Sequence, residues 1–149
     1  MNTCQGDSLG RLIYITTMAL KNYLENRLKP YDLTAEQFQV MKSLVEESGI
    51  AQNRLCEAVA KSPGNITRIL DRLEKKGCIE RKGNPEDRRS SLVCLTGAGE
   101  ELMARVKLEL AGFEAEFTQG LSARQVQDMK DGLRIIYTNI ELNSGVLER

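Results

Sequence analysis

The stretch from Arg54 to Thr96 constrains the fold of this chain more than any other part. At its centre, the run Lys61-Ser62-Pro63-Gly64 predicts that one helix ends and a second one begins. Proline disfavours helical dihedral angles in the residue before it but suits the first helical position, so Ser62 is the expected N-cap. Apolar side chains then recur at three- and four-residue spacing and predict one buried stripe: Ile66, Ile69, Leu70 and Leu73.

Two extended segments are predicted after this helix, which Gly77 is expected to end. They span Cys78 to Lys82 and Ser91 to Thr96, and the run GNPEDRRS between them is rich in turn formers and charge. A short helix from Ile50 to Ala60, a turn, a second helix and a charged hairpin make a winged helix-turn-helix, a DNA-reading arrangement. The predicted fold class is therefore mainly α (α+β), with this core at about residues 34–96.

Further helices are predicted on both sides of the core. Apolar residues trace a broad face along residues 8–29, which indicates an amphipathic helix. A capping box of Thr34 and Gln37 opens the next helix, and a box of Ser122 and Gln125 opens the last one. These signals predict where each helix begins.

The terminal helices are expected to hold two copies of the chain together. Thr96 is a suitable N-cap for a long helix that continues through Gly112 as far as Gly120. The segments 8–29 and 97–143 carry more apolar surface than one small winged helix can cover. Operator-binding proteins usually repeat their recognition helix by two-fold symmetry, so we expect dimerisation helices within a single domain of residues 1–149.

Composition places the chain among ordinary globular proteins. Its 149 residues are 41% hydrophobic and 28% charged, no apolar run approaches a membrane span, and the polar start is not expected to be a signal peptide. A cytoplasmic protein without a membrane partner is therefore expected. Histidine is absent and the four cysteines lack C-x-x-C spacing, so no metal or cofactor is predicted. The chain also lacks a nucleophile elbow and a phosphate-binding glycine loop, so no enzyme is predicted.

The distribution of charge favours a nucleic-acid partner although the net charge is zero. Between Arg54 and Arg89 there are ten Lys and Arg against six Asp and Glu, whereas the remaining chain holds eleven against fifteen. Phosphate contact depends on the local field, so a basic stripe on a neutral protein is sufficient. A solvated helix face is the alternative interpretation, but the adjoining hairpin favours DNA binding.

The same stretch resembles the MarR family of bacterial transcriptional regulators. The resemblance rests on SPGNITRILDRLEKKGCIER and on NPEDRRSSLVCLTGAGEEL, which contains an Asp-x-Arg wing signature and the Leu-Thr-x-x-Gly that opens the next helix. It covers roughly Leu55 to Leu102, and the flanks agree only in helical pattern and length. It implies a homodimeric repressor that binds a pseudo-palindromic operator and responds to a small, often aromatic or anionic effector.

The second helix of the motif supplies the expected base contacts. Its N-terminus offers unpaired N–H groups to a phosphate, and Thr67 and Arg68 lie one turn further, within reach of major-groove base edges. Asp71 on the same face would repel phosphate unless Arg68 and Lys75 neutralise it. Lys76 at the helix end is interpreted as a phosphate contact.

The hairpin tip supplies the second expected contact. The resemblance implies that Arg89 enters the minor groove while Asp87 orients it, and an arginine there favours narrow, A·T-rich flanks. Structural roles are the alternative, because Thr67 could only cap or fill and Asp87 could be an ordinary turn residue. The predicted DNA-binding residues are Ser62, Gly64, Asn65, Thr67, Arg68, Arg72, Lys75, Asp87, Arg88 and Arg89.

Regulation by an effector or by oxidation leaves two sets of candidates. Arg11, Tyr14 and Tyr31 come from segments that could line a cleft between dimerisation helices and DNA-binding lobe, although each could be structural. Cys4 is the candidate for a thiol-based redox-sensing regulator of the same fold, but it precedes the first helix, in which peroxide-sensing family members carry their cysteine. A winged-helix protein-interaction module that does not bind DNA is a further alternative.

Overall fold

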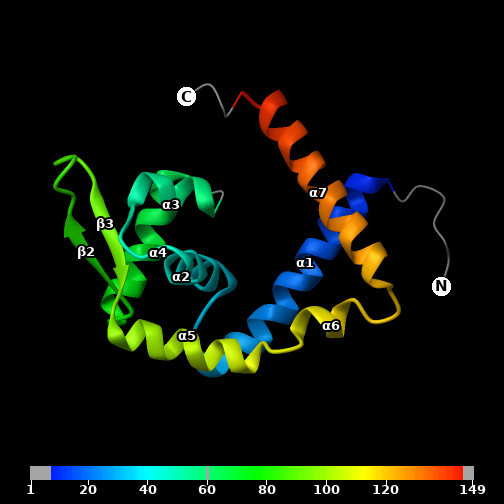
Figure 1. The fold of residues 1–149 in the computed structure, drawn as a ribbon, viewed down its shortest axis with the longest axis horizontal. Helices are drawn as coiled ribbons and strands as arrows, with labels where there is room; N and C mark the ends of the chain where they lie inside the picture. The colour runs from blue at the N-terminus through cyan, green and yellow to red at the C-terminus, as the bar shows by residue number, and fades with distance from the viewer. Residues whose placement is uncertain (1–7, 60, 146–149) are drawn as a thin grey trace. The chain divides into compact units, whose positions relative to one another are not determined.

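The computed structural model describes residues 8–59 and 61–145, and the chain forms two compact units, residues 1–110 and 111–149 (Figure 1). The first unit holds α1 (Leu9–Leu28), the 3-10 helix η1 (Lys29–Tyr31), α2 (Ala35–Glu46), β1 (Ile50–Ala51), α3 (Gln52–Ala58), α4 (Pro63–Lys75), β2 (Ile79–Gly83), β3 (Ser91–Leu95) and α5 (Gly97–Glu109). The second unit holds α6 (Phe113–Phe117) and α7 (Ala123–Asn143). None of the helices described is both long enough and apolar enough to cross a membrane.

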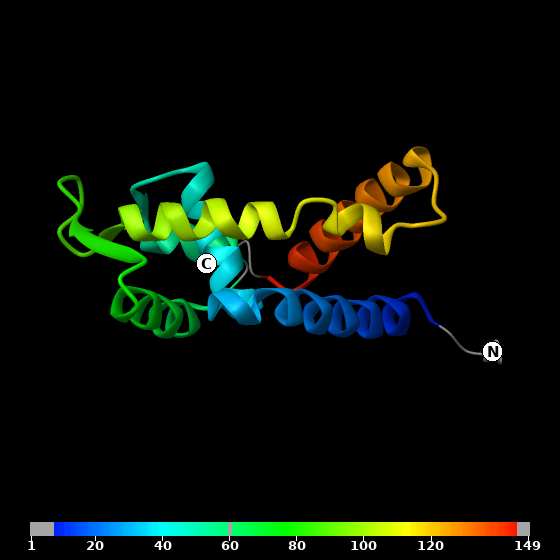
Figure 2. The same ribbon diagram turned by 90° about the horizontal axis from the view of Figure 1, so that it is seen from below.

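The three strands form an antiparallel sheet in the order β1-β3-β2. β3 is central, and its Val93 lies opposite Ile50 of β1 and Arg81 of β2. α4 contacts both α3 and β2, while the tip of the β2–β3 hairpin extends beyond the helices of this unit (Figure 1 and Figure 2). This arrangement confirms the predicted winged helix-turn-helix and the mainly helical fold class.

The apolar stripe of α4 anchors that helix in the core of the first unit. Ile66, Leu70 and Leu73 are fully buried, and Ile69 is 8% exposed. The other fully buried large side chains come from neighbouring helices and strands: Leu28, Val40, Met41, Leu44, Leu55, Ile79, Val93 and Val106. Because one face of α4 is held in this way, its polar face is left to the solvent.

Side-chain caps begin the helices where the sequence predicts. The hydroxyl oxygens of Ser62 and Thr96 accept hydrogen bonds from the backbone N–H three residues later, at 3.4 and 3.1 Å, and cap α4 and α5. Both predicted capping boxes form: Thr34 with Gln37, and Ser122 with Gln125. The starts of α2, α4, α5 and α7 are therefore confirmed.

The helix predicted from Ile50 to Ala60 is wrong at its start. Ile50 and Ala51 form β1, because their backbone pairs with Val93 and Leu92 of β3, and α3 begins only at Gln52. Ile50 is only 5% exposed, so its side chain is buried although it is not part of a helix. The pairing partner lies far along the sequence, which is why local periodicity does not reveal this short strand.

The single long helix predicted from Thr96 to Gly120 is also wrong. α5 ends at Glu109, and Gly112 has φ of 79° and immediately precedes α6. A left-handed conformation is open to glycine but cannot continue a right-handed helix. Gly112 therefore separates two helices where the sequence analysis tolerated it inside one.

Both terminal helices leave apolar surface uncovered. Within α1 only Leu24 and Leu28 are buried, and no described residue of α7 is buried. The large apolar side chains exposed on these two helices are Leu9, Leu12, Tyr14, Ile15, Met18 and Tyr23 on α1, and Met129, Leu133, Ile135, Tyr137, Ile140 and Leu142 on α7. Each unit therefore carries an apolar helix face that its own core does not use.

Candidate nucleic-acid interface

The solvent face of α4 carries open positive charge. All the residues predicted to bind DNA from Ser62 to Lys75 are exposed. Across the described ranges 8–59 and 61–145, no ion pair engages Arg68, Arg72 or Lys75. Their cationic groups are thus available to an external anion. Arg68 lies in the N-terminal half of α4, whereas Arg72 and Lys75 lie in its last turn.

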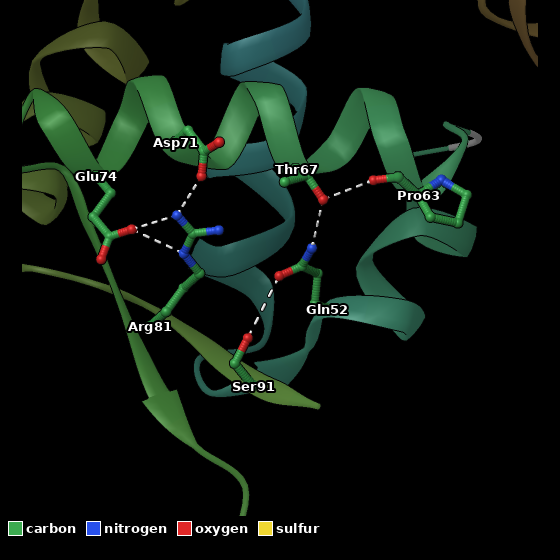
Figure 3. Close-up of polar contacts among 7 residues, drawn as sticks. All are labelled: Gln52, Pro63, Thr67, Asp71, Glu74, Arg81 and Ser91. Atoms are coloured by element: carbon green, nitrogen blue, oxygen red, sulfur yellow. Dashed lines mark hydrogen bonds and ion pairs between the residues drawn. The ribbon is translucent and has the colours of Figure 1, made fainter. Parts of the chain in front are cut away.

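Thr67 is held by hydrogen bonds inside the protein. Its hydroxyl donates to the carbonyl oxygen of Pro63 at 2.9 Å and accepts from Nε2 of Gln52 at 3.1 Å (Figure 3). A hydroxyl has one proton, so Thr67 can only accept a hydrogen bond from a base while this arrangement lasts. Its predicted base contact stays a prediction, and Arg68 is the donor on this turn of the helix.

The partner of Asp71 differs from the one predicted. Arg81 of β2, and neither Arg68 nor Lys75, pairs with it, through Nη2 and Oδ1 at 2.5 Å. The same guanidinium also binds Glu74, with 2.8 Å between Nε and Oε2 (Figure 3). The hydrogen bond to Asp71 is the main cause that raises the pKa of Arg81 above its ordinary value. The sequence analysis missed this contact because it depends on how β2 lies against α4.

Lys76 has partners inside the protein, and its predicted phosphate contact stays a prediction. Its Nζ donates to Oε1 of the buried Gln37 at 3.2 Å and lies 3.4 Å from Oδ2 of Asp32. These bonds hold the C-terminal end of α4 against α2. Beside them is a recess of about 630 Å³ that Lys29, Arg72 and Lys75 also line. The recess gathers positive charge next to the exposed face of α4.

Asp87 and Asn84 build the hairpin tip. The Oδ1 atom of Asp87 accepts from the backbone N–H of Arg89 at 2.9 Å, so Asp87 fixes the backbone that carries this arginine. Asn84 accepts from the N–H of Glu86 at 3.0 Å and donates from Nδ2 to Ser90 Oγ at 3.0 Å. The sequence analysis gave Asn84 no role, although asparagine before proline is a recognised turn signal. The side chains of Arg88 and Arg89 are exposed at this tip.

The structure also contains an apolar pocket of about 720 Å³ between α2 and α5. Phe38, Val45 and Met103 supply apolar lining, and the charged lining is two lysines, Lys42 and Lys107, with two glutamates, Glu46 and Glu100. The predicted effector residues do not line it. Arg11 and Tyr14 lie on the exposed part of α1, where Tyr14 is 67% exposed, and Tyr31 lies in η1.

Two of the three described cysteines, Cys56 and Cys78, have thiols whose pKa is raised. Cys78 is buried, and burial raises the pKa of its thiol, as it also does for Cys56. A raised pKa lowers the thiolate fraction and with it the reactivity toward oxidants. Cys4 lies outside the described residues. No cluster of metal-binding side chains occurs in the part of the chain that the structure covers.

A helix with a buried apolar stripe and an open cationic face, followed by a hairpin with exposed arginines at its tip, defines a winged helix-turn-helix protein. The family model for the MarR family matches residues 33–91. The multiple antibiotic resistance protein MarR of Salmonella typhimurium is 38% identical over 126 residues, which cover 82% of this chain and 85% of that protein. This chain belongs to the MarR family of transcriptional regulators.

Solved structures agree with this assignment. A mutant MarR from Escherichia coli complexed with operator DNA superposes with a TM-score of 0.82 at 33% identity, covering 86% of this chain and 92% of that chain. The oxidized form of MarR from Escherichia coli gives a TM-score of 0.74 at 30% identity, covering 89% and 96%. The resemblance seen in the recognition helix and wing therefore extends over most of the chain.

Proposed function

We propose that this protein represses transcription by binding a pseudo-palindromic DNA operator as a homodimer. The observation that carries the proposal is the exposed face of α4, where Arg68, Arg72 and Lys75 have no ionic partner among the described residues. Cations left open along one helix face suit a nucleic-acid backbone. The complex of the Escherichia coli relative with operator DNA supports the same use of this fold here.

The two parts of the surface have different tasks in this proposal. Arg68 reads a base edge in the major groove, since arginine pairs well with guanine O6 and N7. Arg72 and Lys75 contact phosphates, and the recess shared with Lys29 extends the positive field. Arg89 at the hairpin tip enters the minor groove of the flank.

The dimer is proposed from the uncovered apolar faces of α1 and α7. Contiguous exposed apolar surface on a folded chain usually marks an interaction site. A second copy is the partner that two-fold operator recognition requires, because one chain carries one recognition helix. We therefore assign these helix faces to the interface between two copies.

Two chains are expected to occupy one inverted repeat with half-sites roughly 10 bp apart. Sedimentation at micromolar concentration should give about twice the mass of 16.7 kDa calculated for the chain. Footprinting on the DNA flanking the gene should show the repeat, with affinity that falls as salt rises.

Deleting the segment from Val126 onward should abolish both dimerisation and DNA binding. A clean monomer, or a footprint without an inverted repeat, contradicts the proposal, and salt-insensitive binding favours the protein-interaction module.

We further propose that a small aromatic anion regulates binding from the α2–α5 pocket. The pocket combines apolar walls, which suit an aromatic ring, with Lys42 and Lys107, either of which could pair with a carboxylate on that ring although Glu46 and Glu100 also line the pocket. A ligand that favours one arrangement of the helices around it would shift the spacing of the recognition helices away from the operator. Oxidation is the second candidate because a relative is known in an oxidized form.

Filling the pocket should separate these two modes of control. Ala104→Leu places a larger side chain among its lining residues and should raise the concentration of benzoate derivatives needed for operator release by about tenfold or more. Cys4→Ser should leave release by the same acids and by peroxide unchanged. Both are measured by fluorescence anisotropy of labelled DNA. Loss of the peroxide response in Cys4→Ser alone supports redox control instead.

A further inference from the structure

We propose that Arg81 is a positioning residue for DNA binding, which fixes the wing against the recognition helix so that both engage the operator as one unit. The inference rests on the proposed function and adds to it a residue that does not itself touch DNA. The wing is the β2–β3 hairpin with its tip, and the recognition helix is α4.

Arg81 joins the two elements by a fork of ionic hydrogen bonds. It lies on β2, and its guanidinium reaches two carboxylates one turn apart on α4: Asp71 at 2.5 Å, and Glu74 at 2.8 Å from Nε and 2.5 Å from Nη2 (Figure 3). The planar fork of arginine restricts direction as well as distance, which a single point charge does not. The side chain of Arg81 is 23% exposed, less than that of either partner. This geometry holds the strand at a defined angle to the helix.

Gln52 makes a second tie between the same elements. Its Nε2 donates to the Thr67 hydroxyl on α4 at 3.1 Å, and its Oε1 accepts from the Ser91 hydroxyl at the start of β3 at 3.4 Å (Figure 3). β2 is therefore tied to α4 directly through Arg81, and β3 is tied to α4 through Gln52, the first residue of α3. With a single tie the wing could rotate about that contact. Two separate ties restrict this rotation.

A fixed wing has a direct value for binding. The tip that carries Arg89 extends beyond the helices of its unit, so a small rotation at the base displaces it by a larger distance (Figure 1). A flexible wing loses conformational freedom when it enters the minor groove, and this loss subtracts from affinity. A wing held in place beforehand avoids that loss, so the contact of Arg89 becomes stronger when Arg81 is present.

Arg81 also neutralises two carboxylates on the DNA-facing helix, and this effect must be separated from positioning. Removing Arg81 would expose Asp71 and Glu74 to the phosphates and weaken binding through charge alone. Charge repulsion lowers affinity by the same factor whether or not Arg89 is present. Positioning acts through Arg89, so only positioning makes the effects of the two arginines depend on one another.

The test is a double-mutant cycle of Arg81→Ala and Arg89→Ala. Its probe is a DNA duplex that the wild-type protein selects from a randomised library. We expect Arg89→Ala to weaken wild-type binding about tenfold and to weaken Arg81→Ala by less than about threefold. In an Arg81→Lys background, Arg89→Ala should weaken binding by a factor between those two values, because lysine supplies the charge without the fork. Equal losses from Arg89→Ala in both backgrounds overturn the proposal.

Two further variants control for charge. Lys82→Ala removes a positive charge from the same strand. Among the described residues Lys82 pairs with Glu80 of β2 alone, at 3.0 Å, so the tenfold effect of Arg89→Ala should remain. The double variant Asp71→Ala, Glu74→Ala breaks the fork from the helix side and removes negative charge. The DNA affinity of this double variant should not fall through charge repulsion. Adding Arg89→Ala to it should nevertheless weaken binding by less than about threefold, as in the Arg81→Ala background. A full effect in that background contradicts positioning.

Amide hydrogen exchange in the free protein tests the tie without DNA. In Arg81→Ala the amides of residues 79–95 should exchange about tenfold faster, and Lys82→Ala should leave them unchanged. Unchanged exchange rates in Arg81→Ala would show that Arg81 does not hold the wing against α4. A wild-type protein that selects no duplex overturns the proposed function and with it the role of Arg81 in binding, while accelerated exchange would still identify the tie.

Discussion

Replacing Gly99 with alanine should lower the free energy of unfolding by about 3 kcal/mol. A Cβ atom at this position would lie 2.1 Å from the carbonyl oxygen of Cys78 and 3.2 Å from Cδ2 of Leu95. The first obstacle is backbone, which cannot move aside as a flexible side chain could. The first turn of α5 would have to lift away from the residue that leads into β2.

Several contacts depend on this close approach. The carbonyl oxygen of Cys78 accepts a hydrogen bond from the N–H of Thr96 at 3.0 Å, and the Thr96 hydroxyl donates to the carbonyl oxygen of Gly77 at 2.5 Å. The same hydroxyl oxygen caps α5. Displacing Gly99 would therefore disturb the helix cap and the start of the wing together.

Gly97 provides the matched control, two residues earlier on the same turn. A Cβ atom there meets nothing within 4 Å, so Gly97→Ala should leave the free energy of unfolding unchanged or raise it by up to about 1 kcal/mol. Urea unfolding of both variants at one fixed protein concentration measures the difference, since a dimer's stability depends on concentration. Equal stability of the two variants would show that α5 does not need this approach.

The features that the sequence predicted correctly are local ones. The stripe of Ile66, Ile69, Leu70 and Leu73 follows from helical periodicity, and the caps at Ser62 and Thr96 follow from one side chain and a backbone N–H three residues away. Such signals lie within one turn of the chain. The resemblance to the MarR family rested on the same region and is confirmed by the comparisons.

The features that the sequence did not predict depend on distant partners or on backbone conformation. β1 exists because Ile50 meets Val93, and Asp71 is neutralised from a strand instead of from its own helix. Periodicity along one element cannot reveal either contact. Gly112 shows a different limit, because a glycine inside an apolar pattern is compatible with a continuous helix and with a left-handed break.

Replacing Arg68 by alanine is expected to change operator binding in a different way from replacing Arg89. Arg68→Ala removes a base-edge contact in the major groove, so it should cost about 1–3 kcal/mol of operator binding and relax preference at one position in each half-site. Neither arginine forms an ion pair with any residue that the structure describes, so each substitution removes a cation without stranding a partner carboxylate.

Arg89→Ala acts at the wing tip, outside the inner half-sites. It should weaken binding and reduce the slope of affinity against salt by about one unit per chain, with preference lost only in A·T-rich flanks. Arg89→Lys should restore the salt slope better than the flank preference, because the lysine ammonium is more strongly hydrated and less suited to a narrow groove. The backbone bond from Arg89 N–H to Asp87 persists in both variants, so the tip keeps its shape.

The measurement is operator affinity against salt concentration for each variant, on a panel of duplexes with single base substitutions. A change in base preference within the half-site assigns a residue to the major groove, and a change confined to the flank assigns it to the wing. Asn65→Ala is a useful companion to Arg68→Ala, since Asn65 is exposed on the first turn of α4 but carries no charge and should leave the salt slope unchanged. Identical profiles for Arg68→Ala and Arg89→Ala would show that helix and wing do not divide recognition in this way.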